Sequence, residues 1–293
     1  EGFHNAFWDA LQMGARKAGE ELGGDIFYAG ITAEYESSRV DGQTAVMKKF
    51  VEQGVGGIVF TPCDRIGMVR AVKNAVIKGV QVVAIDSPVE SNLPSSVLAT
   101  NNYGGSLLAA KHMAELLGGQ GEVIMLCHPA RENKATRDRE LALVDGLKQY
   151  APEVKLVSAE QCGGATIDTD YPAAKKLLEQ FPDVDGAYAV SGTGIIGFMM
   201  ALKELDKAGQ VKLIGWDAGP DAVQGLRDGI VHAIVQQNPE KMGYGGGKAV
   251  VAAIKEEEVK RMVDTGVAIV TKENMDDPEI KQLIEPDFGD WIK

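Results

Sequence analysis

The sequence predicts an α/β protein made of two doubly wound, Rossmann-like lobes, each with a parallel sheet covered by helices on both faces. Apolar runs of strand length alternate with helical patterns along nearly all of the 293 residues, which is typical of parallel sheets with right-handed crossovers. These runs number about eleven, and open sheets seldom exceed about 10 strands without splitting. An additional short run at 96–101 interrupts the alternation. We therefore place the break between the lobes at Asn101–Asn102.

The first lobe is predicted to begin with a helix. Its apolar positions recur at helical spacing: Phe7, Leu11, Ala15, Ala18 and Leu22. No strand precedes this helix, and we interpret that as a sign that residues precede Glu1. The other predicted elements of this lobe are strand 25–30, helix 37–53, strand 56–62, helix 68–78, strand 80–86 and strand 96–101.

The second half of the chain repeats the alternation. Its predicted elements are helix 104–117, strand 122–127, helix 135–150, strand 154–159, helix 171–181, strand 186–190, helix 194–208, strand 212–216, helix 219–228, strand 231–237, helix 239–256, strand 267–271 and a short helix in the tail. The glycine-rich run MGYGGGK at 242–248 lacks the strand–loop–helix context of a phosphate-binding loop. We expect these glycines to let two helices pack closely.

Composition and charge exclude several classes of function. The formal charge of −12 argues against a nucleic-acid partner and against binding to an anionic membrane surface. The four histidines have no metal-ligand spacing, and no GxSxG elbow or acid–base pair is found. We therefore expect no catalytic residues, no metal and no cofactor. Cys127 lies in an apolar run and is interpreted as a core thiol, whereas Cys162 lies in a loop.

Two similar stretches suggest where a ligand binds. VKLIGWDAGPDA at 211–222 and GVQVVAIDSPVE at 79–90 each run from an apolar strand into an aspartate and then a turn with proline. Asp217 and Asp86 therefore stand at the carboxyl ends of strands, where open α/β sheets bind ligands. Each aspartate alone is also explained by turn formation. As a pair they indicate acceptors for the hydroxyl groups of a polyol.

Other candidate residues have a structural alternative beside the functional one. Trp8 lies off the apolar stripe at the start of the first helix and is either packed on a loop or a flat wall for a ligand. Asn5 is a helix cap or an amide for that ligand. Arg137 and Arg139 reach solvent, or one guanidinium serves a ligand oxygen. Ser191 and Gln237 end strands, so their side chains could face the same cleft.

Taken together, these residues resemble the periplasmic sugar-binding proteins of ABC transporters, the group that includes the ribose-, allose- and galactose-binding proteins. The resemblance covers nearly the whole chain. It rests on the order of several stretches: HNAFWDALQMGA (4–15), GIVFTPCD (57–64), VVAIDSP (82–88), TNNYGGSLLAA (100–110), TRDR (136–139), FPDVDGAYAV (181–190), LIGWDAGPDA (213–222), IVQQNP (234–239) and VTKENMDDPEI (270–280).

The resemblance implies a periplasmic binding protein-like fold of type I, in which two lobes joined by a three-segment hinge close on a sugar. The implied lobes are 1–101 plus 239–265 and 102–238 plus 266–293. The implied ligand-binding residues are Asn5, Phe7, Trp8, Asp86, Arg139, Ser191, Asp217 and Gln237.

The sequence also departs from the ribose-binding pattern. Ser191-Gly192 replaces an Asn-Asp pair, Ser87 replaces an arginine, and Thr61 replaces an asparagine. The resemblance therefore points to a sugar or sugar alcohol that need not be ribose, such as another pentose or a hexose.

These observations predict a monomeric, non-enzymatic receptor that delivers a sugar or polyol to the membrane permease of an ABC importer. The expected location is periplasmic, or extracytoplasmic with a lipid anchor. One alternative is the effector domain of a sugar-responsive repressor, which has the same fold but needs an upstream helix-turn-helix. Another is a nucleotide-dependent enzyme, which needs a GxGxxG after the first strand.

Overall fold

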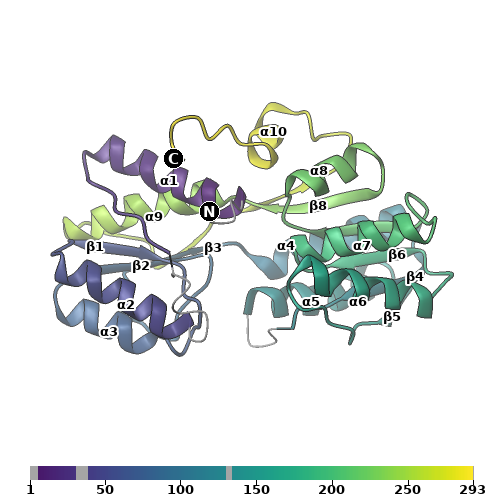
Figure 1. The fold of residues 1–293 in the computed structure, drawn as a ribbon, viewed down its shortest axis with the longest axis horizontal. Coiled ribbons are helices and arrows are strands. Elements are labelled where there is room, and N and C mark those ends of the chain that lie inside the picture. Colours follow the sequence, from purple (N-terminus) through teal and green to yellow (C-terminus); the bar gives the residue numbers. More distant parts are fainter. Residues whose placement is uncertain (1–5, 31–38, 130–133, 293) are drawn as a thin grey trace. The chain divides into compact units, whose positions relative to one another are not determined.

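A computed structural model describes residues 6–30, 39–129 and 134–292. The chain divides into two compact units. The first contains residues 1–100, 238–265 and 288–293, and the second contains residues 101–237 and 266–287. Both units are α/β, and each contains one sheet with helices on its two faces (Figure 1).

The sheet of the first unit is parallel throughout. Its strands follow the order β1-β2-β3-β9, with bounds β1 Gly57–Phe60, β2 Gln81–Ile85, β3 Ser96–Ala99 and β9 Met262–Asp264. Successive residues of β2 are buried on opposite faces: Val82 joins the apolar cluster under α2 and α3, whereas Val83 joins the cluster under α1 and α9. Burial on both faces explains the uninterrupted apolar run.

Four helices cover this sheet, two on each face (Figure 1). Their bounds are α1 Ala6–Leu22, α2 Arg39–Glu52, α3 Val69–Ile77 and α9 Pro239–Ile254. α1 and α9 pack with their backbones in contact: a Cβ on Gly14 would collide with the carbonyl oxygen of Glu240, and one on Gly243 with that of Leu11. The structure thus agrees with the interpretation of the glycine-rich run as a helix-packing surface.

The predicted strand at 25–30 is wrong. These residues form no strand, and the side chains of Ile26, Phe27 and Tyr28 are 43%, 65% and 51% exposed. A run of β-branched and aromatic residues favours a strand, but a strand exists only where a neighbour completes its hydrogen bonds. No described strand pairs with this segment. Conversely, β9 was not predicted. It has only three residues, which are too few to form a recognisable apolar run.

The sheet of the second unit has six strands in the order β10-β8-β7-β6-β4-β5. Their bounds are β4 Gln120–Leu126, β5 Glu153–Ser158, β6 Gly186–Ala189, β7 Lys212–Trp216, β8 Val231–Gln237 and β10 Val267–Val270. Five strands are parallel, as predicted, but β10 pairs antiparallel with β8. The expectation of a wholly parallel sheet is wrong at this edge, because β10 follows an excursion of the chain through the first unit and no crossover helix of this unit precedes it.

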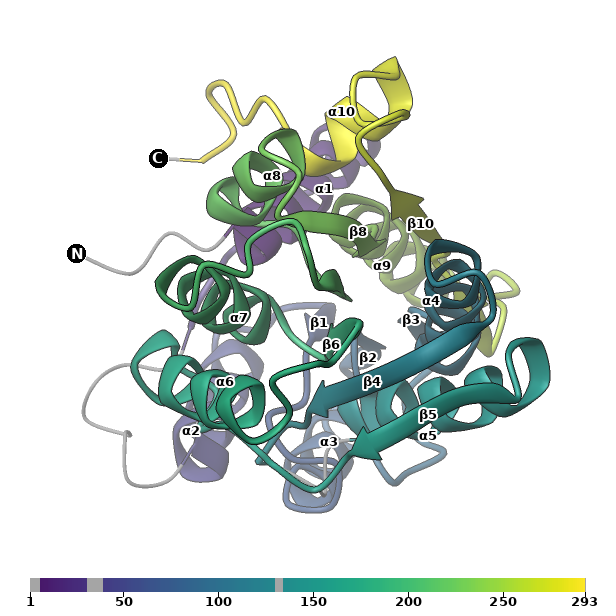
Figure 2. The same cartoon turned by 90° about the vertical axis from the view of Figure 1, so that its right-hand side faces the viewer.

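The helices of the second unit lie on both faces of its sheet, with α4 and α5 on one face and α6 and α7 on the other (Figure 2). The bounds are α4 Asn102–Leu116, α5 Lys134–Tyr150, α6 Ile167–Gln180, α7 Gly192–Glu204, α8 Pro220–Arg227 and α10 Pro278–Ile284. Along β7, Leu213 faces the α6–α7 side and Ile214 and Trp216 face the α4–α5 side. Both faces are therefore apolar cores.

The end of the chain differs from the implied lobe boundaries. Residues 288–293 cluster with the first unit, whereas the resemblance placed all of 266–293 in the second. Trp291 provides the physical reason, because the ammonium group of Lys17 on α1 lies 5.9 Å from the centroid of its ring. A cation over an aromatic face is attracted by the ring quadrupole.

A disulfide joins the end of β4 to the loop before α6. Cys127 and Cys162 are bonded, with their Cα atoms 4.4 Å apart. The backbone supports the same contact, since the Cys127 N–H donates to Gln161 O at 3.0 Å and the Gly163 N–H donates to Cys127 O at 3.3 Å. Cys127 is buried, as predicted, but it is not the free thiol that we expected. A separation of 35 residues has no sequence signature that could reveal such a pair.

We expect the double substitution Cys127→Ala/Cys162→Ala to lower the thermal stability of the protein. Closing a loop of this length restricts the unfolded chain and contributes on the order of 3–4 kcal/mol. Thermal unfolding followed by circular dichroism measures the effect, and a reducing agent should reproduce it with the natural sequence. Cys63→Ala is the control, because Cys63 has no disulfide partner. Equal melting temperatures for the double variant and the natural protein would contradict this account.

Candidate functional site

The carboxyl ends of four parallel strands lie along one edge of the second unit's sheet. β4, β6, β7 and β8 run side by side in parallel register. Asp217 directly follows β7, Ser191 lies two residues after β6, and Gln237 is the last residue of β8. The sequence-predicted residues of this unit are thus brought to a single edge, where α/β sheets bind ligands.

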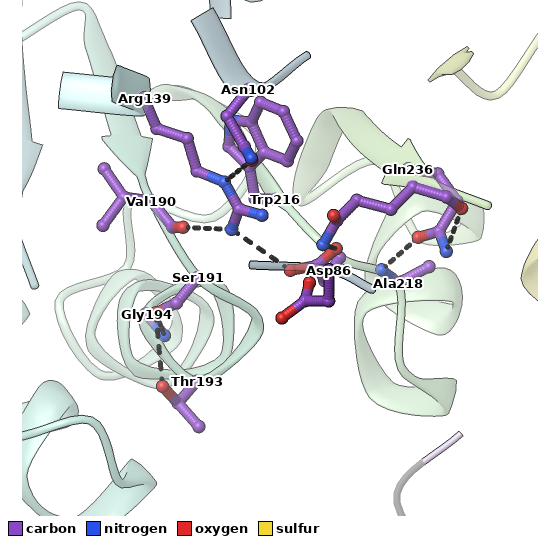
Figure 3. Close-up of polar contacts among 12 residues, drawn as sticks. Asp86, Asn102, Arg139, Val190, Ser191, Thr193, Gly194, Trp216, Ala218 and Gln236 are labelled. Carbon is purple, nitrogen blue, oxygen red and sulfur yellow. Dashed lines mark hydrogen bonds and ion pairs between the residues drawn. The ribbon is translucent and has the colours of Figure 1, made fainter. Parts of the chain in front are cut away.

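Arg139 reaches this edge from α5 and is held by three hydrogen bonds (Figure 3). Its Nε donates to Asn102 Oδ1 at 2.8 Å, and its Nη1 donates to Val190 O at 2.9 Å and to Asp217 Oδ2 at 3.2 Å. The side chain is only 5% exposed, whereas Arg137 is exposed. Of the two candidate arginines, the structure therefore places Arg139 at the strand ends.

The guanidinium group of Arg139 is both buried and compensated. An ion taken out of water costs several kcal/mol unless opposite charge and hydrogen bonds replace the solvent. Asp217 supplies the charge, and the face of Trp216 lies under the guanidinium, with Cζ 3.9 Å from the ring centroid. Nη2 makes no hydrogen bond with any residue that the structure describes.

Asp217 is anchored through both carboxylate oxygens. Oδ2 accepts from Arg139, and Oδ1 accepts from Gln237 Nε2 at 2.9 Å. Its side chain nevertheless remains 28% exposed. A carboxylate has about four lone-pair sites, so two remain for other donors. The carboxylate is thus fixed in direction and still open to a ligand.

The neighbouring residue on β8, Gln236, fixes the turn that follows Asp217. Its Oε1 accepts from the Ala218 N–H at 2.6 Å, and its Nε2 donates to Gln237 O at 3.0 Å (Figure 3). Gln236 is almost fully buried. Gln236 therefore holds the backbone that follows Asp217, and the adjacent Gln237 holds the Asp217 carboxylate.

The first unit contains an equivalent strand end at Asp86. This aspartate directly follows β2, and its N–H donates to Leu98 O of β3 at 2.9 Å. In the second unit the Asp217 N–H donates to Val235 O of β8 at 3.0 Å. Ser87 Oγ donates to Asp86 Oδ2 at 3.3 Å. Each unit thus places one aspartate directly after an inner strand of its sheet. In both units the N–H of this aspartate is bonded to a carbonyl group of the neighbouring parallel strand.

Both aspartates adopt left-handed backbone conformations, with φ of 65° at Asp86 and 68° at Asp217. Most residues avoid this region, and asparagine and aspartate are among the few side chains that tolerate it. At a strand end, a turn of this kind requires a residue that tolerates the left-handed conformation, and aspartate does so. The conformation turns the chain away from the sheet immediately after the carboxylate.

Ser191 has a structural role that accounts for its identity. It is the N-cap of α7, and its Oγ accepts from the Gly194 N–H at 3.3 Å. Its hydroxyl also lies 3.3 Å from Thr193 Oγ1 (Figure 3). Serine is a favoured N-cap for this reason. The capping role alone is therefore enough to explain a serine at position 191.

The aromatic residues of α1 lie in the first unit. Phe7 is half-buried against the cluster under α1 and α9, which agrees with its interpretation as a core residue. Trp8 is 40% exposed and meets the Phe7 ring edge-on, with centroids 4.9 Å apart. Asn5 lies outside the described residues. A role for Phe7, Trp8 and Asn5 in binding therefore stays a prediction.

Sequence reasoning missed three residues of this site. Asn102 was placed only at the break between the lobes, Trp216 only within a strand, and Gln236 was not considered. Their contacts with Arg139 and Ala218 join segments far apart in the chain, so no local pattern announces them. The only available signal was their polar or amphipathic character within apolar segments.

A hollow of about 470 Å³ in the first unit contains none of the predicted ligand residues. Its lining residues are Arg16, Glu20, Gly24, Asp25, Ile26, Asp290 and Trp291. Within the described part of the chain, no group of three or more His, Cys, Asp or Glu side chains is arranged to hold a metal ion.

We expect Asp86→Ala to destabilise the protein more than Asp86→Asn. Both variants lose the charge, but alanine disfavours a φ of 65° by roughly 1–2 kcal/mol, and asparagine tolerates it. Urea unfolding measures the difference. Asp221, in the first turn of α8, is the matched position with helical backbone, and there alanine should be no worse than asparagine. An equal cost of the two Asp86 variants would show that the left-handed backbone is not under constraint.

Comparison with protein families and curated proteins agrees with the fold. Residues 1–258 match the sequence model of the family described as "Periplasmic binding protein domain". The ribose import binding protein RbsB of Bacillus subtilis is 25% identical over 269 residues, covering 92% of this chain and 84% of the relative. The D-allose-binding periplasmic protein of Escherichia coli is 25% identical over 260 residues, covering 86% and 81%.

Solved structures give the same result at higher identity. A carbohydrate transporter solute-binding protein from Agrobacterium radiobacter, in complex with D-arabinose, is 29% identical and superposes with a TM-score of 0.85, covering 96% of this chain and 95% of its own. An ABC transporter solute-binding protein from Agrobacterium vitis, with bound D-fucose, is 28% identical with a TM-score of 0.84, covering 97% of each chain.

Proposed function

Because this chain belongs to the periplasmic binding protein domain family, we propose that it is a receptor that binds a sugar or sugar alcohol and delivers it to the permease of an ABC importer. The observation that carries the proposal is the anchored pair Arg139–Asp217 at the strand ends of the second unit. Relatives named for ribose, allose and xylitol, and structures with arabinose and fucose, support this class of ligand.

The chemistry of the pair suits a neutral ligand rich in hydroxyl groups. The open lone pairs of Asp217 accept hydroxyl protons, and the N–H groups on Nη2 of Arg139 donate to hydroxyl or ring oxygens. Hydrogen bonds to charged groups contribute about 1.5–3 kcal/mol each when well placed. The two charges already neutralise each other, so the site does not require a charged ligand. We assign the protein no catalytic step, no cofactor and no metal.

We propose that Asp86 of the first unit supplies a second carboxylate to the same ligand, together with Phe7, Trp8 and Asn5. Both units then contact the sugar. A ligand that contacts both units binds the closed arrangement better and shifts the population toward it. Hinge closure of this kind is the motion for which periplasmic binding proteins are a named example. The chain passes between the units at 100/101, 237/238 and 265/266, and again at 287/288 for the tail.

We propose that the protein acts as a monomer in the periplasm, or as a lipid-anchored protein outside the cytoplasmic membrane. The disulfide between Cys127 and Cys162 supports this location, because disulfides persist in oxidising compartments and are rare in the cytosol. Among the described helices, none combines the length and the hydropathy needed to cross a bilayer.

A thermal-shift panel tests the proposed function. We expect at least one of D-ribose, D-allose, D-arabinose, D-fucose, D-tagatose and xylitol to raise the melting temperature, because a ligand at 100 times its Kd stabilises the native state by about 2.7 kcal/mol. NAD serves as the comparison and should give no shift. A shift with NAD and with none of the sugars would overturn the receptor assignment in favour of a nucleotide-dependent protein.

Asp217→Asn tests the site. The substitution keeps the left-handed backbone and an acceptor for Gln237 but removes the charge, so we expect the affinity for the best ligand of the panel to fall by roughly 10- to 100-fold. Isothermal titration calorimetry measures the affinity. Asp206→Asn is the matched control, because Asp206 also has a positive φ, is exposed, and lies at the opposite end of the strands after α7. Unchanged affinity of Asp217→Asn would remove this residue from the site.

A further inference from the structure

Trp216 is the last residue of β7, directly before Asp217, and its side chain is fully buried beneath Arg139. The guanidinium carbon lies 3.9 Å from the ring centroid, which places the cation on the face of the indole (Figure 3). Three hydrogen bonds hold the guanidinium at its Nε and Nη1 side, and the indole supports its plane from below. The direction of the free Nη2 therefore depends on the orientation of the indole.

The indole is itself fixed by two buried hydroxyl groups. Trp216 Nε1 donates to Tyr188 OH at 2.7 Å and to Ser106 Oγ at 3.1 Å, and these two hydroxyl oxygens lie 2.6 Å apart. All three side chains are inaccessible to solvent. Burial raises the pKa of Tyr188 to about 12, so its hydroxyl keeps its proton and takes part in the hydrogen bond with Ser106.

Packing removes the remaining freedom of the ring. A Cβ on Gly105 of α4 would lie 2.5 Å from Cη2 of Trp216, so the indole fits directly against the helix backbone. Buried hydroxyl and N–H groups are costly unless every one is paired. An apolar residue at position 216 would fill this core without needing Ser106 or Tyr188 as hydrogen-bond partners. The indole N–H and the two hydroxyl groups satisfy one another and so define the orientation of the indole. Packing of an apolar side chain would not require such an orientation.

We infer that Trp216, oriented by Tyr188 and Ser106, is a positioning residue for ligand recognition: it sets the plane of the Arg139 guanidinium and so aims Nη2 at the ligand. This inference rests on the proposed function, because it assumes that Arg139 donates to the sugar. Because Trp216 is fully buried, it acts on the ligand through Arg139.

A double-mutant cycle separates this role from a general contribution to the core. The probe is the sugar or polyol that gives the largest thermal shift with the natural protein. We expect Trp216→Leu to weaken its binding about tenfold, the size of one lost hydrogen bond to a charged group, and Trp216→Phe to recover only part of the loss, because it retains an aromatic face but not the N–H that Tyr188 and Ser106 orient. In an Arg139→Lys background, Trp216→Leu should have no further effect on affinity, since lysine has no planar guanidinium fork whose direction the indole could set.

Phe198→Leu is the matched control, because Phe198 is equally buried but lies in the core on the opposite face of the sheet. It should lower the melting temperature and leave the affinity unchanged. An equal loss of affinity from Trp216→Leu in both backgrounds, or from Phe198→Leu, would show that the effect is structural and overturn the inference.

A second measurement works without ligand. The Nε–H of Arg139 donates to Asn102, so its proton should be protected from exchange in NMR spectra of the natural protein. We expect Trp216→Leu and Tyr188→Phe to accelerate this exchange at least tenfold, and Phe198→Leu to leave it unchanged. Unchanged exchange in both Trp216→Leu and Tyr188→Phe overturns the positioning role even if sugars bind. Absence of sugar binding by the natural protein, with exchange as expected, instead overturns the proposed function.

Discussion

The buried charge of Arg139 is the constraint on which the second unit's strand edge depends. A guanidinium group with 5% exposure is tolerated only where acceptors and opposite charge surround it. Asn102, the carbonyl of Val190 and Asp217 provide these from α4, the end of β6 and the end of β7. Three segments of the chain are therefore tied to one cation. The same cation fixes one oxygen of Asp217 and leaves its own Nη2 open, which is the arrangement expected of a prepared binding site.

The two units have the same backbone arrangement at the ends of their strands β2 and β7. Each ends a central strand with an aspartate in the left-handed conformation, and each ties the aspartate N–H to the next parallel strand. The surroundings differ, because Asp217 is held by Arg139 and Gln237, whereas Ser87 donates to Asp86. The carboxylate of Asp217 is thus rigidly oriented by its ion pair with Arg139.

The sequence predicts the fold well because continuous apolar strands and helical periodicity are local signals. It also predicts Asp86, Asp217 and Gln237 as strand-end residues, since the carboxyl ends of parallel strands share an edge. Their roles in ligand binding remain proposals. It fails where the outcome depends on partners distant in the chain. Strand 25–30 lacks a neighbour, and Cys127 finds Cys162 across 35 residues.

The site shows the same limit for single side chains. The pattern around α5 could not choose between Arg137 and Arg139, because both lie in the first turns of the helix. Only the packed structure shows that Arg137 is exposed and that Arg139 is held by Asn102, which the sequence placed only at the break between the lobes. Ser191 illustrates the reverse case, because a residue predicted to bind a ligand has a sufficient explanation as a helix cap.

The central claim is that a sugar or polyol is bound at the strand ends through Asp217 and Arg139. A crystal structure of the protein with the ligand selected by the thermal-shift panel tests it most directly. The account predicts density for the ligand with one hydroxyl group within hydrogen-bond distance of an Asp217 carboxylate oxygen and an oxygen within the same distance of Arg139 Nη2. Density for the ligand elsewhere on the molecule, with Asp217 and Arg139 unchanged and in contact with solvent alone, would contradict it.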